Sequence, residues 1–139
     1  MFVRDCMTAR PVTINSGETL ATAAAVMRAG NFRRLPVVDD DVLVGIISEY
    51  DFCKWEDSLD RTAVAVAMTR EVIVVAASDS LEHAVTLAKL HQIGALPVVD
   101  HGRLVGIITA KDLWIAEPRP LPQWDHISKG QGLLHKLKR

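Results

Sequence analysis

The stretch LPVVDDDVLVGIIS, Leu35 to Ser48, returns 61 positions later as LPVVDHGRLVGIIT, Leu96 to Thr109. The same offset matches Met7-Thr8 to Met68-Thr69 and Leu20 to Leu81, without a gap. A gapless tandem duplication predicts two copies of one supersecondary unit that pack together with equivalent surfaces facing each other. We therefore expect functional sites in this chain to come in related pairs.

The hydrophobic pattern changes in the same order within each copy. Short β-branched runs at residues 12–14 and 72–75 predict strands. Helices are predicted behind the N-cap candidates at residues 16–18 and 78–80, because apolar residues then recur at helical spacing (Leu20, Ala24 and Met27; Leu81, Val85 and Ala88). The quoted stretch predicts two strands that are covered on both faces, and a further helix begins at Ser48 or Thr109. Each copy is thus predicted as a β-α-β-β-α unit, α+β in class.

The duplication also sets the expected domain boundaries. Copy 1 covers residues 1–57, a polar connector covers 58–62, and copy 2 covers 63–116. The remaining residues, 117–139, contain three prolines that favour an extended chain, followed by a basic end. This C-terminal segment could dock on its own module, on a dimer mate or on a partner protein.

Composition excludes several classes of function. The chain has 139 residues, is 49% hydrophobic and carries a net charge of −1, which suits one globular domain and offers no broad basic field for nucleic acid. No apolar run approaches the roughly 20 residues of a membrane span, and the start leaves no room for a signal peptide. Cys6 and Cys53 show no pairing pattern, so we expect a cytoplasmic protein. Histidine spacing predicts no metal site, and no nucleophile or phosphate-loop motif predicts catalysis.

The repeated motifs carry a family resemblance. The order Met-Thr, strand, helix, LPVVD and LVGII-(Ser/Thr)-x-x-Asp resembles a cystathionine β-synthase (CBS) domain, and two copies in tandem resemble the Bateman module. The resemblance covers about residues 3–116. It implies two units packed with pseudo-two-fold symmetry into one module. It also implies a regulatory adenosyl ligand (AMP, ADP, ATP or S-adenosylmethionine) in clefts between the repeats, with no required cofactor.

The resemblance places the ribose-binding carboxylates at Asp51 and Asp112. Vicinal ribose hydroxyls can donate to one carboxylate in bidentate, charge-assisted fashion. Ser48 and Thr109 would each add a hydroxyl one helical turn earlier. The same Ser/Thr-x-x-Asp spacing also fits a helix capping box, which stabilises a helix start without any ligand. The two roles are compatible.

Cations are expected to select phosphates, and here the copies differ. The resemblance assigns phosphate-facing roles to Arg33 and Arg34 in copy 1 and to Lys111 in copy 2; the planar donor fork of guanidinium suits this task. Copy 2 has Gly94-Ala95 where copy 1 has the two arginines. We therefore expect one better site and one weaker or empty site. The alternative is that the arginines form a solvated pair at a helix end.

An adenine ring needs an apolar slot with backbone groups for its edge. The resemblance assigns this slot to the early strand and the Leu-Pro segment of each copy: Val12, Thr13, Leu35 and Pro36, and Ile73, Val74, Leu96 and Pro97.

The sequence thus predicts a non-enzymatic sensor that changes conformation on binding an adenosyl ligand and signals to a partner. The resemblance implies a homodimer, and the output calls for a protein effector that the sequence does not identify. Two alternatives stay open: a ligand-free structural or protein-interaction module, and nucleic-acid binding through the basic C-terminal end, which the neutral total charge disfavours.

Overall fold

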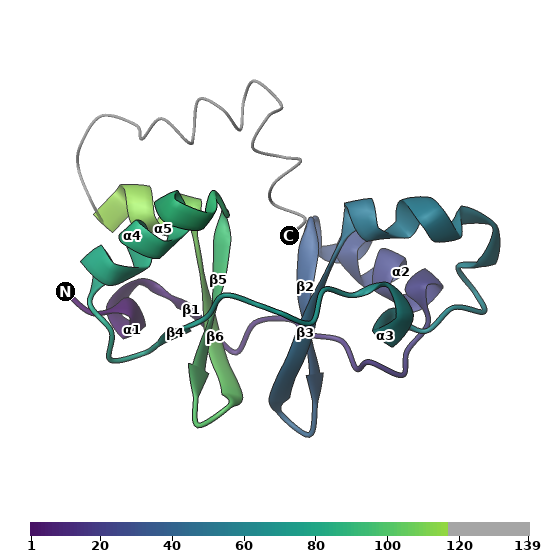
Figure 1. Cartoon of the computed structure of the whole chain (residues 1–139), viewed down its shortest axis with the longest axis horizontal. Coiled ribbons are helices and arrows are strands. Elements are labelled where there is room, and N and C mark those ends of the chain that lie inside the picture. Colours follow the sequence, from purple (N-terminus) through teal and green to yellow (C-terminus); the bar gives the residue numbers. More distant parts are fainter. Residues whose placement is uncertain (117–139) are drawn as a thin grey trace. The chain divides into compact units, whose positions relative to one another are not determined.

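A computed structural model describes residues 1–116 of the chain (Figure 1); the predicted C-terminal segment, 117–139, lies outside the described residues. The helices are α1 (Val3–Cys6), α2 (Leu20–Gly30), the 3-10 helix η1 (Glu49–Ser58), α3 (Val64–Ala67), α4 (Leu81–His91) and α5 (Ala110–Ala116). The strands are β1 (Thr8–Ala9), β2 (Arg34–Asp39), β3 (Val42–Ser48), β4 (Val75–Ala76), β5 (Ala95–Asp100) and β6 (Arg103–Thr109). The mixed α+β class predicted from the sequence is confirmed.

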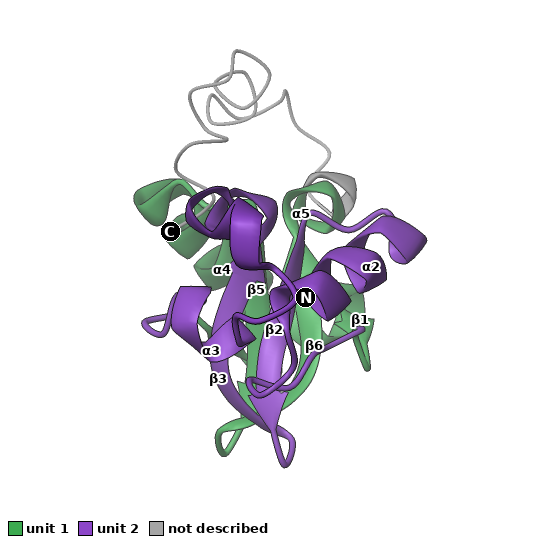
Figure 2. Cartoon of the chain, turned by 90° about the vertical axis from the view of Figure 1, so that its right-hand side faces the viewer, with its two compact units in different colours: residues 1–11, 73–137, 139 green, residues 12–72, 138 purple. Residues whose placement is uncertain are grey.

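The chain forms two compact units whose boundaries differ from those of the two sequence copies (Figure 2). Among the described residues, unit 2 is the continuous stretch 12–72, whereas unit 1 combines residues 1–11 with residues 73–116. The leading segment of copy 1 therefore belongs to the unit that is otherwise built from copy 2. The leading segment of copy 2, which contains α3, belongs to unit 2.

Backbone hydrogen bonds hold each leading segment in its unit. In unit 1 the amide of Val3 donates to the carbonyl of Asp79 at 2.9 Å, and the amide of Leu81 donates to the carbonyl of Met1 at 3.0 Å. In unit 2 the amide of Val64 donates to the carbonyl of Glu18 at 2.7 Å. The sequence pattern did not predict the short helices α1 and α3, because four residues are too few to show a helical period.

The two predicted hairpins are confirmed. In unit 2, β2 and β3 pair antiparallel with Leu35 opposite Ile47, and in unit 1, β5 and β6 pair in the same register. Each turn places two consecutive residues at positive φ: Asp40 and Asp41 at 52° and 68°, and His101 and Gly102 at 52° and 82°. Such turns match the right-handed twist of the flanking strands.

The early strands are shorter than predicted. In unit 2 only Ile14 forms a bridge, parallel to Val37 in β2, and in unit 1 the two-residue strand β4 pairs parallel with β5 through Val75 and Val98. These contacts are equivalent in the duplication and place residues 12–14 and 73–75 beside the Leu-Pro-Val strand of the same unit.

One predicted helix cap is wrong and its counterpart is confirmed. Thr19, not a residue of 16–18, caps α2 by accepting a hydrogen bond from the amide of Thr22 at 3.1 Å. Ser16 instead donates its hydroxyl to Oδ2 of Asp39 at 2.7 Å, which fastens the loop before α2 to the end of β2. The Ser80 hydroxyl caps α4 as predicted, accepting from the amide of His83 at 3.1 Å.

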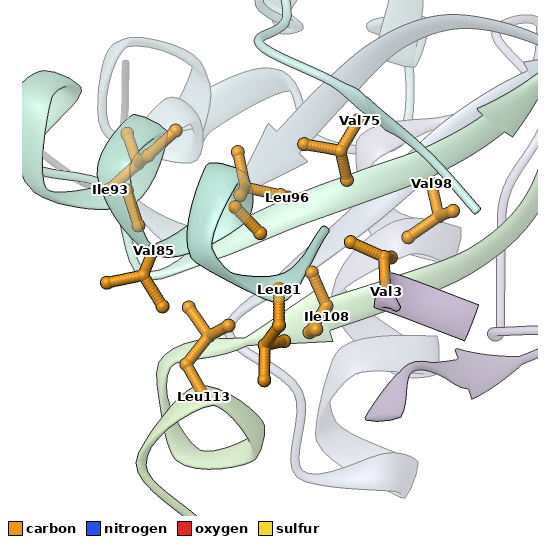
Figure 3. Packing of buried hydrophobic residues seen from close by; sticks show 11 residues of the cluster. Val3, Val75, Leu81, Val85, Ile93, Leu96, Val98, Ile108 and Leu113 are labelled. Carbon is orange, nitrogen blue, oxygen red and sulfur yellow. The ribbon is translucent and has the colours of Figure 1, made fainter. Parts of the chain in front are cut away.

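Each unit has its own hydrophobic core. In unit 1, Val3 is fully buried together with side chains from α4, α5 and the β5–β6 hairpin, as Figure 3 shows for Leu81, Leu96, Ile108 and Leu113. In unit 2 the fully buried Val64 takes the equivalent place, beside Leu20, Leu35, Val37 and Ile47. Val3 of α1 and Val64 of α3 are therefore core residues of the unit into which each helix packs.

The repeated glycines permit close packing of the Met-Thr segments. A Cβ atom at Gly106 would lie 2.5 Å from Sδ of Met7 and 2.9 Å from the carbonyl oxygen of Thr8. At Gly45 the corresponding distances to Met68 and Thr69 are both 2.7 Å. Backbone this close leaves no room for a side chain.

Candidate functional site

The first turn of the helix that follows each hairpin has the same geometry in both units. In unit 2, Oδ2 of Asp51 accepts hydrogen bonds from the amide of Ser48 at 2.7 Å and from its hydroxyl at 3.1 Å. In unit 1, Oδ2 of Asp112 accepts from the amide and the hydroxyl of Thr109, both at 2.9 Å. The two aspartates that the sequence singles out thus occupy equivalent positions, each directly behind a hairpin.

These contacts fit helix capping, which is compatible with a ligand-binding role of the same side chains. The amide of Ser48 and the carboxylate of Asp51 form the capping-box contact in unit 2. An ionised carboxylate offers about four lone-pair sites on two oxygens. A carboxylate that caps a helix can therefore also accept hydrogen bonds from the hydroxyl groups of a ligand.

Unit 2 adds a cation next to its Ser-Asp pair. Arg34 lies directly opposite Ser48 in the β2–β3 register and is half-buried. Burial lowers the pKa of the Arg34 guanidinium, and the neighbouring charge of Arg33 lowers it further, whereas Glu49 acts in the opposite direction. Nε of the exposed Arg33 lies 3.9 Å from Oε1 of Glu49. Arg34 is therefore the partly desolvated cation of this pair, and Arg33 is the solvated one.

Unit 1 has no arginine at the positions equivalent to Arg33 and Arg34. Ala95 lies opposite Thr109, at the position that Arg34 has opposite Ser48. The amide of Ala110 donates to the carbonyl of Gly94 at 2.8 Å, which is the backbone contact that Glu49 makes with Arg33 in unit 2. Lys111 is exposed, one residue before Asp112. The two units therefore share backbone geometry and differ in charge.

The segments predicted to hold adenine come together within each unit. In unit 2 the amide of Ile14 donates to the carbonyl of Pro36 at 3.1 Å, which brings the chain after Val12 and Thr13 alongside β2. Val12 is exposed and Thr13 is half-buried. In unit 1 the parallel pairing of β4 with β5 brings Ile73 and Val74 to Leu96 and Pro97 in the same way.

Not every predicted adenine residue offers its side chain. Leu35 and Leu96 are each 1% exposed and belong to the cores of their units. Pro36 and Pro97 are also fully buried. A ligand beside these strands would therefore meet the backbone of the Leu-Pro segments, together with the side chains of residues 12–13 or 73–74.

Sequence reasoning missed one residue near the candidate site of unit 1. Burial raises the pKa of the Cys6 thiol, and the negative charges of Asp5 and Asp112 raise it further. Cys6 is thus near enough to Asp112 to respond to its charge, although it belongs to copy 1. The repeated Met-Thr motif directly behind Cys6 was the available signal, but it does not reveal into which unit the segment packs.

Within residues 1–116, no cluster of three His, Cys, Asp or Glu side chains is arranged to hold a metal ion. None of the helices in this part of the chain is both long enough and apolar enough to cross a membrane.

Comparisons with known proteins match this architecture. The CBS domain family model matches the chain twice, at residues 3–58 and 63–113. The CBS domain-containing protein YhcV of Bacillus subtilis is 35% identical over 114 residues, which are 80% of this chain and 81% of that protein. The match to inosine-5'-monophosphate dehydrogenase of Mycobacterium leprae is 39% identical and covers 86% of this chain but only 23% of the enzyme. The match therefore covers only a small part of the enzyme, and most of the enzyme's length lies outside it.

Two similar solved structures contain ligands. CBSX2 in complex with AMP is 31% identical, with a TM-score of 0.76 over 83% of this chain and 94% of that one. The CBS domain pair of protein MJ0100, in complex with 5-methylthioadenosine and S-adenosyl-L-methionine, is 30% identical, with a TM-score of 0.73 over 84% and 94%. The duplicated motifs, the fold of each unit and these matches agree, and the chain belongs to the CBS domain family as a tandem pair.

Proposed function

We propose that this chain is a regulatory module that binds an adenosyl ligand, with Asp51 and Asp112 as the carboxylates that receive ribose hydroxyls. The observation that carries the proposal is the recurrence of one hydrogen-bonded Ser/Thr–Asp pair, with the same atoms at nearly the same distances, behind both hairpins. Relatives of the same fold hold AMP, 5-methylthioadenosine and S-adenosylmethionine.

The charge difference between the units supports a preference for phosphate at one site. In unit 2 the half-buried Arg34 stands beside the Ser48–Asp51 pair, whereas unit 1 has Ala95 at that place. A partly desolvated guanidinium binds phosphate more strongly than a fully solvated one, because fewer water molecules compete. We propose that AMP, ADP or ATP binds through unit 2, with Arg33 as an outer cation. Unit 1, with Lys111 alone, would prefer an adenosyl ligand with fewer phosphates or none.

We infer a regulatory role rather than catalysis. The match to inosine-5'-monophosphate dehydrogenase covers 23% of that enzyme, so the similarity by itself transfers no catalytic activity to this chain. Ligand binding would favour one of two conformations, and a protein effector or a second copy of the chain in the cytoplasm would respond to the change.

Isothermal titration calorimetry with AMP, ATP and S-adenosylmethionine tests the proposal. We expect Asp51→Ala and Asp112→Ala each to weaken binding at its own site about tenfold or more, because charge-assisted hydrogen bonds worth about 1.5–3 kcal/mol are lost. Ser80→Ala is the matched control, since Ser80 caps α4 and belongs to neither site. All three variants should lose about 1 kcal/mol of stability through the lost cap.

Two outcomes would contradict the proposal. If no adenosyl compound binds at millimolar concentration, the aspartates are caps and the chain is a structural or protein-interaction module. If a ligand binds with equal affinity to the wild type and to the Asp51→Ala, Asp112→Ala double variant, the ligand site lies elsewhere. An Arg34→Ala variant should weaken the binding of ATP more than the binding of adenosine. Equal loss of affinity for both ligands would refute the assignment of Arg34 to the phosphates.

A further inference from the structure

A set of side-chain hydrogen bonds joins two segments of unit 2 that lie 23 positions apart in the sequence. Both carboxylate oxygens of Asp39, at the end of β2, accept from Ser16: Oδ1 from its amide at 3.1 Å and Oδ2 from its hydroxyl at 2.7 Å. Nδ2 of Asn15 donates to the carbonyl of Val38 at 2.8 Å. These three contacts, which we call the latch, fasten residues 15–16 to the end of β2.

The latch holds the chain that follows residues 12–13, the candidate adenine segment of unit 2. Between this segment and the latch, Ile14 forms a β-bridge to Val37. Its amide donates to the carbonyl of Pro36 at 3.1 Å, and its carbonyl accepts from the amide of Val38 at 2.9 Å. The net gain from two backbone hydrogen bonds is small compared with the conformational entropy of an ordered segment. We therefore expect the segment to depend on the latch for its place beside β2.

Unit 1 holds the equivalent segment through its backbone. Ala76 and Ala77 stand at the places of Asn15 and Ser16 and have no hydrogen-bonding group in their side chains. Ala76 belongs to the two-residue strand β4, which pairs parallel with β5 (Figure 1). Its amide also donates to Oδ2 of Asp79 at 2.9 Å. Strand pairing and a local turn thus take the place that the latch has in unit 2.

The carboxylate equivalent to that of Asp39 has a different contact. Oδ1 of Asp100, at the end of β5, lies 2.8 Å from Nδ1 of His101 in the adjacent turn. Asp100 shares the strand position of Asp39, and the residue that corresponds to Ser16 offers it no hydroxyl. Asp100 is therefore a matched control for substitutions of Asp39.

The acceptor of the latch is charged at neutral pH. Asp40 and Asp41 follow Asp39 in the same turn, yet the hydrogen bonds from Ser16 lower the pKa of the Asp39 carboxyl. Hydrogen bonds to an ionised acceptor are about twice as strong as those between neutral groups. The latch is therefore a strong attachment for a segment with little strand pairing of its own.

We propose that Asp39 is a positioning residue of the unit 2 site, which acts through Ser16 to keep residues 12–13 docked beside β2 in the conformation that binds ligand. This inference rests on the proposed function. Without the latch the segment leaves β2 in part of the molecules, and the apparent affinity falls by the fraction that is still docked. Because this fraction is a property of the free protein, every ligand of the unit 2 site loses affinity by the same factor.

Isothermal titration calorimetry in an Asp112→Ala background tests the proposal, because this background weakens the unit 1 site. We expect Asp39→Ala to weaken adenosine and ATP by the same factor, about three- to tenfold. In contrast, Arg34→Ala should weaken ATP more than adenosine. Asp39→Asn keeps one carbonyl oxygen for the Ser16 amide and should give an intermediate affinity. Asp100→Ala should leave the affinity unchanged.

Native-state hydrogen exchange without ligand measures the docking of the segment directly. The amides of Ile14 and Val38 report it, since both take part in the contact between this segment and β2. We expect Asp39→Ala to speed exchange at these two amides about tenfold or more, as for the loss of hydrogen bonds to a charged group. Asp100→Ala should leave both rates unchanged.

The two measurements separate this inference from the proposed function. If the parent protein binds ligand and Asp39→Ala binds it with the same affinity, the latch is merely structural and the inference alone is overturned. A loss confined to ATP, or an equal loss in Asp100→Ala, would also overturn it. If the parent and the wild type bind no adenosyl compound, the proposed function fails and the inference fails with it. Should Asp39→Ala not fold, Ser16→Ala decides by the same criteria, because it removes only the hydroxyl that Oδ2 accepts.

Discussion

Val3→Ala should destabilise the unit built mainly from copy 2, although Val3 belongs to copy 1. Val3 is fully buried in the core of unit 1. The substitution removes two methyl groups worth about 0.8 kcal/mol each, and the cavity adds to this, so we expect a loss of about 2–3 kcal/mol. Val64→Ala is the matched control, because Val64 is equivalent in the duplication, equally buried, and packs in the core of unit 2.

Native-state hydrogen exchange separates the two variants. With Val3→Ala, the amides of β5 and β6 should exchange about 30- to 150-fold faster, and those of β2 and β3 should change less; Val64→Ala should give the opposite pattern. A larger effect of Val3→Ala on β2 and β3 than on β5 and β6 would show that the leading segment packs within its own copy, and would refute the exchanged packing.

Three further predictions rest on single contacts. The hydroxyl and the amide of Ser16 donate hydrogen bonds to the Asp39 carboxylate and lower its pKa. The stability that these hydrogen bonds contribute is therefore present above the unfolded pKa of about 3.9, and it is lost as the pH falls through the lower folded pKa. Asp39→Asn should therefore lower the urea midpoint at pH 7 and have a diminishing effect toward pH 2; an effect that grows on acidification would contradict this. Gly106→Ala should cost about 1–3 kcal/mol in urea unfolding through overpacking, whereas Gly17→Ala, with nothing within 4 Å of its new Cβ, should stay within about 0.5 kcal/mol; equal effects would refute the close-packing argument. Iodoacetamide should label the exposed Cys53 several-fold faster than Cys6, whose pKa burial raises, and mass spectrometry that finds Cys6 labelled first would count against this environment.

The hairpins were predictable because local chemistry determines them. Each is a pair of apolar runs joined by a turn that needs two residues at positive φ, and the sequence supplies Asp40-Asp41 and His101-Gly102 there. The N-cap residues were less predictable, because several side chains near the start of a helix can accept a hydrogen bond from its first amides. Thr19 takes this role since Ser16 is engaged by Asp39, a residue 23 positions away that no local pattern connects to it.

The candidate site divides in the same way. Asp51 and Asp112 could be named from the repeated motif, and their equivalent contacts follow from equivalent hairpins. The half-buried place of Arg34 opposite Ser48 depends on strand register, and the approach of Cys6 to Asp112 depends on tertiary packing. No local sequence pattern reveals either of these two features. Sequence reasoning therefore identified Arg33 and Arg34 as a pair without separating their roles, and it missed the Cys6 thiol.

The exchanged leading segments have a consequence for biosynthesis. Unit 2 is one uninterrupted stretch, so all of its residues are available once Val72 has left the ribosome. Unit 1 is different, because residues 1–11 need partners in α4 and β6 that are synthesised only after the whole of unit 2. During translation these residues, with Val3 among them, remain exposed while another core forms. Chaperone contacts and premature proteolysis of the nascent chain should therefore concentrate at residues 1–11.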